Sequence, residues 1–392
     1  MNHTKKTSKL SSPFNILDKE VKPIFATNLV GSTGDGLYAY LLPRYMTEAL
    51  GATSVEIGIL YAVMSLTAAL TLLIAGIYAD KYDRKKIMIA GWVAWLPAPL
   101  IFSMATNWLQ MLPGMILWGV WLGGPTSTAY IVTTVDKSRL TSTFTVLSAA
   151  WSIGYTFSPA LGGYMAKTIG MNIVFYLSSI LYAVATLILF FIKSQKTITT
   201  KSSEEMRSFL KLLKTRKLVA LSAFFASMMF ILMLMRPFIP KFLGEEYGYS
   251  DFEIGIFGSI SFFSSAVLGI LLGKLGDRKG KAHALAASML LCSASLALIL
   301  LSNMLPILII AFFLAGGSYI IWSLMSAVVG PLAPEYIRGR WICIPQSITM
   351  LSSFIAPYIG GLLYAVSPYY PFIITMAIAP FLALLSFAKI LE

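Results

Sequence analysis

The sequence predicts an all-α membrane protein in which twelve transmembrane helices form two six-helix bundles around a central cleft. Three observations lead to this fold: the chain has few charges, long gaps between them, and an internal repeat. Of its 392 residues, 57% are hydrophobic and 12% are charged, and the mean hydropathy is +0.77. A soluble domain carries roughly 25% charged residues, so the apolar excess excludes an ordinary soluble enzyme.

Cysteine and histidine are too scarce for most metal or cofactor chemistry. The chain has two cysteines, Cys292 and Cys343, and two histidines, His3 and His283, which lie far apart in sequence. These numbers exclude a disulfide framework and a cysteine-based zinc site. The sequence also lacks a nucleophile–base pair and a phosphate-binding loop. We therefore expect no enzyme activity, no cofactor and no metal site.

The gaps between charged residues are long enough to hold transmembrane helices. Glu56 and Asp80 are separated by 23 uncharged residues, and 49 separate Lys86 from Asp136. A helix that crosses the hydrocarbon core needs ~20 apolar residues, so the longest runs hold two crossings each. These runs are 87–135, 282–334 and 341–388. Turn residues near their midpoints divide them, namely Asn107, Asn303 and Pro368. Counting all runs gives twelve crossings.

The basic residues indicate how the chain is oriented. If the N-terminus is inside, 26 of the 30 Lys and Arg residues lie in cytoplasmic segments, and the exceptions are Arg44, Lys167, Arg236 and Lys241. Because cytoplasmic loops collect Lys and Arg, we expect a multi-pass protein, in the plasma (cytoplasmic) membrane, with both termini in the cytoplasm. The net charge of +13 is then a topology signal, and we expect no nucleic-acid partner. Residues 1–22 show no cleaved signal peptide.

An internal repeat relates the two halves of the chain. A shift of 197 residues aligns them without a gap, and seven of the seventeen positions 43–59 are identical. The first residues of the identical pairs are Pro43, Glu48, Gly51, Glu56, Ile57, Gly58 and Ile59. Six crossings separate the copies, so both copies run the same way through the membrane, as in parallel repeats related by an axis along the membrane normal. Two like bundles meeting at this axis leave a cleft at mid-membrane depth.

The repeat also predicts the domains. We expect a cytoplasmic tail at 1–22, a first bundle at 23–192, a cytoplasmic linker at 193–217 and a second bundle at 218–392. The linker is the one long polar segment and holds eight Lys and Arg residues. Its Ser-Glu-Glu at 203–205 precedes an apolar-periodic stretch, which indicates a short amphipathic helix on the membrane surface. A solvated linker fits this composition as well.

The loop after the second predicted crossing occurs in two copies. Residues 76–86 read Gly-Ile-Tyr-Ala-Asp-Lys-Tyr-Asp-Arg-Lys-Lys, and residues 273–281 read Gly-Lys-Leu-Gly-Asp-Arg-Lys-Gly-Lys. This pair resembles the G-x-L-A-D-R-x-G-R-K signature of the major facilitator superfamily. The resemblance implies a latch that holds the cytoplasmic side shut when the transporter opens outward, with its glycines letting helices approach closely. The gating residues would be Gly76, Asp80, Arg84, Gly273, Asp277 and Arg278.

The fifth and eleventh predicted crossings share a second motif. Residues 154–163 read Gly-Tyr-Thr-Phe-Ser-Pro-Ala-Leu-Gly-Gly, which is similar to the G-x-x-x-G-P-x-x-G-G motif of proton-coupled drug exporters in that superfamily. Residues 356–361 echo it. Pro159 and Pro357 would bend these helices or let them pack closely, and we count them with the gating residues. Two departures are that Asp83 replaces a motif glycine and that residues 112–135 contain no arginine, which many such exporters carry there.

Asp35 is the only acid expected well inside a crossing, on a helix running from about Lys22 to Met46. An acid there costs ~2.5–3.5 kcal/mol on insertion scales, and intramembrane acids are functional by default. A carboxyl whose surroundings alternate could take a proton outside and release it inside. We therefore expect Asp35 and Arg236 to serve proton coupling. The alternative is a structural ion pair or hydrogen bond, for which Arg236 is the nearest candidate in the repeat frame.

Polar and aromatic residues at mid-helix depth are candidates for a substrate pocket. We select nine of them: Asn28, Tyr38, Trp118, Trp121, Tyr155, Met229, Met233, Trp322 and Gln346. Methionine is flexible and polarizable, so surfaces rich in it suit loose binding of many partners. As a group, these side chains argue against a sugar site, although lipid contact or bundle packing better explains any single one of them.

These features predict a secondary transporter that exports amphipathic or hydrophobic small molecules against proton entry, by alternating access and as a monomer in the bilayer. Two alternatives stay open. One is a proton-coupled importer of a small organic solute, and the other is a membrane sensor on the same fold that does not transport. Asp35 and the duplicated loop favour transport over the sensor.

The topology can be tested by cysteine labelling. In a background without Cys292 and Cys343, a cysteine replacing Lys201 should react with a membrane-impermeant maleimide only after the membrane is opened. A cysteine replacing Glu246, in a segment expected outside, is the control and should react in intact cells. Labelling of position 201 from outside would overturn the orientation.

Overall fold

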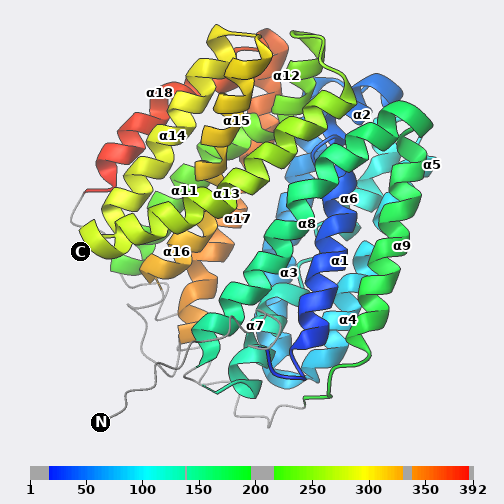
Figure 1. The fold of residues 1–392 in the computed structure, drawn as a ribbon, viewed down its shortest axis with the longest axis vertical. Helices are drawn as coiled ribbons and strands as arrows, with labels where there is room; N and C mark the ends of the chain where they lie inside the picture. Colours follow the sequence, from blue (N-terminus) through cyan, green and yellow to red (C-terminus); the bar gives the residue numbers. More distant parts are fainter. Residues whose placement is uncertain (1–16, 137–138, 196–215, 330–337, 388–392) are drawn as a thin grey trace, which may run out of the picture.

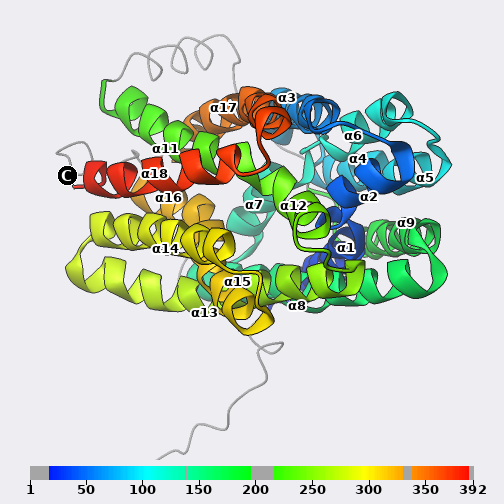
Figure 2. The ribbon, with the colours of Figure 1, turned by 90° about the horizontal axis from the view of Figure 1, so that it is seen from above.

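The computed structural model describes residues 17–136, 139–195, 216–329 and 338–387, and these residues form helices and turns with no strand among them (Figure 1). The helices form two groups that lie side by side (Figures 1 and 2). The first group consists of α1 (Lys22–Ala39), α2 (Leu42–Leu50), α3 (Ser54–Lys81), α4 (Arg84–Trp95), α5 (Pro97–Met104), the short helix η2 (Trp108–Met111), α6 (Leu112–Trp118), α7 (Gly123–Thr134), α8 (Leu140–Ile169) and α9 (Met171–Leu189).

The second group repeats this order. It consists of α11 (Arg216–Met235), the short helix η4 (Arg236–Phe238), α12 (Ile239–Glu245), α13 (Asp251–Lys279), α14 (Lys281–Leu301), α15 (Leu305–Tyr319), α16 (Ile321–Val329), α17 (Arg338–Val366) and α18 (Tyr370–Leu385). We call the top of Figure 1, near α2 and α12, the Arg44 end. The opposite end, where α3 ends and α4 begins, is called the linker end.

The membrane-crossing helices agree in part with the predicted count. Eight helical segments of the described residues are long and apolar enough to span a membrane. The other four predicted crossings correspond to α1, to α6 with α7, to α8 and to α18, which do not qualify as full spans by this criterion. The all-helical membrane fold is therefore confirmed, and the count of twelve and the domain boundaries stay predictions. The predicted surface helix of the linker lies outside the described residues.

The first predicted crossing is not one helix from about Lys22 to Met46, as we expected, because it divides into α1 and α2 at Tyr40 and Leu41. Pro43 explains the division. It has no N–H to donate to the carbonyl four residues earlier, at Ala39, where α1 ends. Pro240 occupies the equivalent position near the start of α12. The repeat therefore places a helix break at the same level of both groups.

The long helices α3 and α13 begin in the same way. Each starts with a capping box, in which Thr53 exchanges hydrogen bonds with Glu56, and Ser250 with Glu253. Gly51 precedes the first box with φ of +64°, and Gly248 precedes the second with φ of +70°, a conformation that favours glycine. Several residues that are identical in the two copies therefore specify a helix start. They make α3 and α13 begin at equivalent positions.

Helices of the two groups touch at their backbones near the Arg44 end. Packing of α3 along α17 and of α8 along α13 makes the main contacts between the groups. A Cβ added to Gly58 would lie 2.4 Å from the carbonyl oxygen of Pro357, and one added to Gly255 would lie 2.2 Å from that of Pro159. In the same way, a Cβ added to Gly163 would lie 2.2 Å from the carbonyl oxygen of Asp251, and one added to Gly361 would lie 2.4 Å from that of Ser54. Small residues thus let the helices approach, as in other membrane proteins.

The glycine contacts can be tested with matched controls on the same helices. Changing Gly58 and Gly255 to alanine forces a methyl group against backbone, at a cost of about 1–3 kcal/mol for each overpacked site. We expect a lower melting temperature of the purified double variant. Gly76→Ala with Gly273→Ala is the control, because a Cβ there meets nothing within 4 Å. Equal melting temperatures for the two double variants would contradict this account of the interface.

Candidate functional site

The carboxylate of Asp35 is buried in α1 and accepts hydrogen bonds from four side chains of the first helix group. Trp118 Nε1 donates over 2.7 Å, the hydroxyl of Tyr182 over 2.5 Å and that of Tyr38 over 3.3 Å. The hydroxyl of Tyr155 also donates to Asp35 Oδ2. An ionised carboxylate can only accept, so four O–H and N–H donors match its needs without a cation. We call these five residues the Asp35 cage.

The exporter-like motif of α8 helps to build the Asp35 cage. Its small residues follow one another at every fourth position along the face toward α1. A Cβ on Gly154 would lie 2.0 Å from Ser32 Oγ, and one on Gly36 of α1 would lie 1.9 Å from Ser158 Oγ. The resulting close approach of α1 and α8 puts Tyr155 beside Asp35. The neighbouring face of α8, with Pro159, packs on α13, so the motif serves two interfaces.

Trp118 reaches the cage because the fourth predicted crossing is interrupted. α6 ends at Trp118 and α7 begins at Gly123. Side chains of other helices bind the backbone groups that the interruption leaves free: Trp95 Nε1 donates to the carbonyl of Val120 over 2.7 Å, and the N–H of Trp121 donates to Thr71 Oγ1 over 2.9 Å. An interruption at membrane depth is tolerated where protein groups satisfy the backbone.

Arg236 does not pair with Asp35, contrary to the candidate ion pair. No ion pair within 4.0 Å joins the two side chains, both of which the structure describes. Arg236 Nη2 donates instead to the carbonyl oxygen of Ser318 over 2.9 Å and to Ser318 Oγ over 3.3 Å. The guanidinium carbon lies 4.3 Å from the ring centre of Tyr319. The shift of 197 residues makes Arg236 equivalent to Ala39, close to Asp35 in sequence. Equivalent residues lie in different helix groups, however, so this equivalence does not bring the two side chains together.

Aromatic rings connect the two sites across the interface between the groups. The Tyr155 ring centre lies 4.7 Å from that of Phe262, and Phe262 lies 5.0 Å from Tyr319. Tyr155 belongs to the first helix group, whereas Phe262 and Tyr319 belong to the second. We call these three residues the aromatic bridge. It lies between Asp35, which Tyr155 contacts, and Arg236, which Tyr319 contacts.

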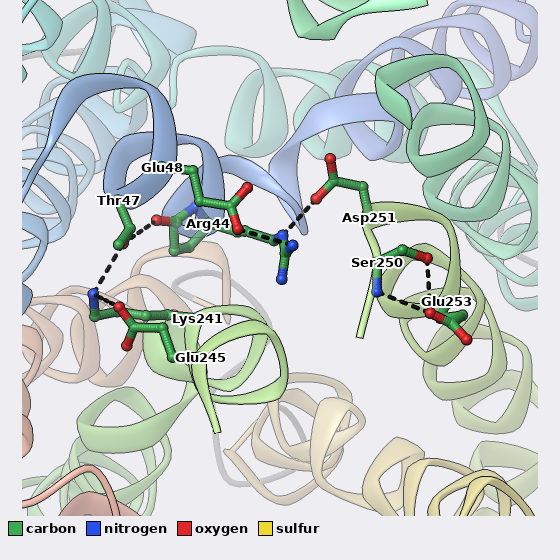
Figure 3. A network of polar contacts seen from close by, with 9 residues as sticks. Arg44, Thr47, Glu48, Lys241, Glu245, Ser250, Asp251 and Glu253 are labelled. Carbon is green, nitrogen blue, oxygen red and sulfur yellow. Dashed lines mark hydrogen bonds and ion pairs between the residues drawn. The ribbon is translucent and has the colours of Figure 1, made fainter. Parts of the chain in front are cut away.

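A network of charges joins the groups at the Arg44 end (Figure 3). Arg44 Nε lies 2.6 Å from Asp251 Oδ1 of the other group, and Arg44 Nη2 lies 2.8 Å from Glu48 of its own helix. Lys241 Nζ lies 2.7 Å from Glu245 and donates to Thr47 Oγ1 across the interface over 3.1 Å. The Arg44 and Lys241 side chains are 14% and 7% exposed, whereas those of Glu48 and Glu245 are 54% and 40% exposed, so only the basic partner of each helical pair is shielded from water.

Sequence reasoning missed this network, although the repeat contained its signal. Under the shift of 197 residues, Arg44 matches Lys241, and Glu48 matches Glu245. We interpreted both basic residues only as exceptions to the positive-inside pattern. A basic residue and an acid four positions apart in both copies already predicted two helical ion pairs. The contact of Arg44 with Asp251 needed the tertiary structure.

Asp83, a departure from the motif, has a structural role at the linker end. It caps α4 by accepting from the N–H of Lys85, and it accepts from Ser194 Oγ and from the N–H of Gln195. Partial burial acts to raise the pKa of this carboxyl, but these hydrogen bonds outweigh it, so the net pKa is lowered. The capping is therefore present at neutral pH and is lost as pH falls through that pKa. Its equivalent, Gly280, has φ of +101°, which explains the glycine there.

The described part of the structure shows the surroundings of four predicted latch residues: Gly76, Gly273, Asp277 and Arg278. The expected close approach at Gly76 and Gly273 is not seen, because a Cβ on either meets nothing within 4 Å. Asp277 pairs with Lys281 over 2.7 Å and not with Arg278, which is exposed. The Asp80 side chain lies outside the described part of the structure. The gating role of these residues stays a prediction.

Arg84, the remaining latch residue, binds within the first helix group. Its Nη1 donates to Gln195 Oε1 over 2.7 Å and to the carbonyl of Ala129 over 3.0 Å, while Nε donates to the carbonyl of Ala79 over 3.1 Å. These bonds tie the start of α4 to α3, to α7 and to the segment after α9. The side chain therefore holds the linker end of this group together.

The structure brings only three of the nine pocket candidates together. The structure brings Tyr38, Trp118 and Tyr155 together around Asp35. Trp121 packs instead on Trp95, with ring centres 5.5 Å apart. No hydrogen bond or ring contact with the Asp35 cage is found for the other five, of which Met229 is buried and the rest are partly exposed: Asn28, Met229, Met233, Trp322 and Gln346. Their role in binding stays a prediction. Tyr182, which completes the cage, was not selected from the sequence.

A family model and two named relatives match most of the chain. The model of the Major Facilitator Superfamily matches residues 24–238 and, a second time, residues 219–391. The chain is 24% identical over 370 residues to "Multidrug resistance protein 2" of Bacillus subtilis, covering 91% of each chain. It is 27% identical over 369 residues to "Multi-drug resistance efflux pump PmrA" of Streptococcus pneumoniae serotype 4, covering 86% of this chain and 82% of that protein.

Solved structures agree on the fold. The crystal structure of the nucleoside transporter NupG superposes with a TM-score of 0.76 at 14% identity, covering 95% of this chain and 99% of that one. A POT family transporter in complex with 5-aminolevulinic acid gives a TM-score of 0.75 at 13% identity, covering 95% and 98%. With both halves matching the family model, the chain belongs to the Major Facilitator Superfamily and is a membrane transporter, not an enzyme.

Proposed function

We propose that this transporter exports amphipathic or hydrophobic small molecules in exchange for protons. The observation that carries the proposal is the Asp35 cage, in which a buried acid of α1 has only neutral hydrogen-bond partners. Relatives named for multidrug resistance support export of such molecules. We further propose a monomer of two six-helix bundles, with both termini in the cytoplasm.

The Asp35 cage suits a group that gains and loses a proton. Its donors are hydroxyl and indole groups of one helix group, so no fixed cation holds the carboxylate ionised. Tyr155 is the member that touches the second group, through Phe262. When the groups rock apart, α13 would carry Phe262 away and expose Tyr155. Access of water to Asp35 would then alternate with the transport cycle.

The proposed orientation identifies which side of the transporter is closed in this structure. If the Arg44 end faces outside, the glycine contacts and the charge network close the outer side. The empty surroundings of Gly76 and Gly273 fit an inner side whose latch is not engaged. The structure would then represent a state closed to the outside, from which breaking the contacts of Arg44 and Lys241 opens the outer side.

Asp35→Asn should uncouple transport from protons. A proton that enters down 100 mV gains ~2.3 kcal/mol, which can support roughly a 50-fold concentration ratio. We expect the variant to lose this accumulation in proteoliposomes with an imposed pH gradient and potential, but to keep exchange of labelled substrate. Tyr38→Phe, which removes the longest hydrogen bond of the cage, is the milder control. An Asp35→Asn protein that still concentrates substrate with normal pH dependence would refute the role.

Asp251→Asn should favour opening of the Arg44 end, because it removes the ion pair between the groups. A loss of only ~1.4 kcal/mol shifts a two-state equilibrium about tenfold. Thr106 and Asn303 are equivalent exposed positions at this end of the two groups. With spin labels at both positions, double electron–electron resonance would report a longer distance between the labels. Glu48→Gln is the control, since it breaks an ion pair within one helix. If only the control lengthened the distances, the network would not be the outer closure.

A further inference from the structure

Arg236 is a cation at membrane depth whose hydrogen bonds are incomplete. Of its three nitrogens, only Nη2 has partners, both of them in Ser318. Nε is buried without a partner, and Nη1 makes no hydrogen bond although it is not buried. The residue as a whole is partly exposed. An arginine inside a membrane span is costly and calls for a partner or a function.

No acid of the described residues neutralises Arg236. Asp35 is saturated by its four donors and lies beyond the aromatic bridge. The nearest acids along the chain are engaged elsewhere: Glu245 with Lys241, Asp251 with Arg44, and Glu253 in the capping box of α13. The guanidinium therefore keeps an unpaired positive charge next to the interface between the helix groups.

We propose that Arg236, with Ser318 and Tyr319, is the subsite that binds the carboxylate of an amphipathic substrate. Ser318 fixes one edge of the guanidinium and Tyr319 supports its face, which orients the free Nη1. Arginine presents a planar fork that matches a carboxylate and forms short charge-assisted hydrogen bonds with it. The rings of Phe262 and Tyr155 continue from Tyr319 and would contact the apolar body of the same molecule.

This inference rests on the proposed export function and narrows its substrate class. A lipophilic cation would meet an unpaired guanidinium and be repelled. An organic anion would neutralise it. The transporter should therefore prefer amphipathic carboxylates over neutral or cationic molecules with the same apolar body.

Three fluorescent probes with one apolar body test the preference: pyrenebutyrate, pyrenebutanol and pyrenebutylamine. Binding would be measured by energy transfer from tryptophan in nanodiscs, with protein-free nanodiscs subtracted for partition into lipid. We expect wild type to bind pyrenebutyrate at least about tenfold more tightly than pyrenebutanol. Arg236→Gln should remove this preference and leave pyrenebutanol affinity within about twofold, whereas Arg236→Lys should keep part of it.

Arg216→Gln is the matched control, because Arg216 is exposed at the other end of the same helix, α11. It should keep the full preference. Melting temperatures of all variants establish that they fold. A wild type without preference for the carboxylate, or an Arg236→Gln protein that keeps it, would overturn the subsite. If pyrenebutanol and pyrenebutylamine bind and exchange in proteoliposomes without such preference, only this inference fails; if none of the three binds, the proposed function fails with it.

Discussion

Contact of glycine with backbone carbonyls, between helices of the two groups, is the constraint on which the other features depend. Because Gly255 lies on the carbonyl of Pro159, α13 comes near enough for Ser259 to accept the N–H of Ala160 over 3.0 Å. Phe262, one turn further, then meets Tyr155 of the Asp35 cage. The same approach lets Arg44 reach Asp251. A larger side chain at these glycines would separate the groups and disconnect all three contacts.

The protein accommodates its intramembrane acid with neutral donors instead of a cation. Residues 112–135 have no arginine, and Trp118 from this stretch donates to Asp35 directly. Hydrogen bonds to a charged group are each worth about 1.5–3 kcal/mol, so four of them offset much of the cost of burial. This arrangement also bears on Arg236 in the other helix group. Asp35 needs no cation, and Arg236 binds within its own helix group instead, to Ser318 and the ring of Tyr319.

The repeat builds the charge network at the Arg44 end, and differences between the two copies make their contacts unequal. Arg44 and Lys241 are equivalent, as are their acids Glu48 and Glu245. However, Gly244 stands where the first copy has Thr47, and the Arg44 guanidinium lies over it, 1.7 Å from the position of a Cβ. Arg44 thus crosses to a carboxylate, whereas Lys241 crosses only to the hydroxyl of Thr47. One ion pair between the groups is easier to break than two.

Composition, charge gaps and the repeat predicted the all-helical membrane fold and singled out Asp35 as an acid inside a crossing, because the bilayer acts on each segment of the chain separately. The resemblance of the duplicated loop motif predicted the family. Helix breaks such as that at Tyr40, the four donors of the Asp35 cage and the separation of Arg236 from Asp35 were decided by the tertiary structure. Tyr182 lies 147 positions from Asp35, and no local pattern encodes that meeting. It follows from the close approach of helices, which depends on side-chain volumes at many interfaces at once.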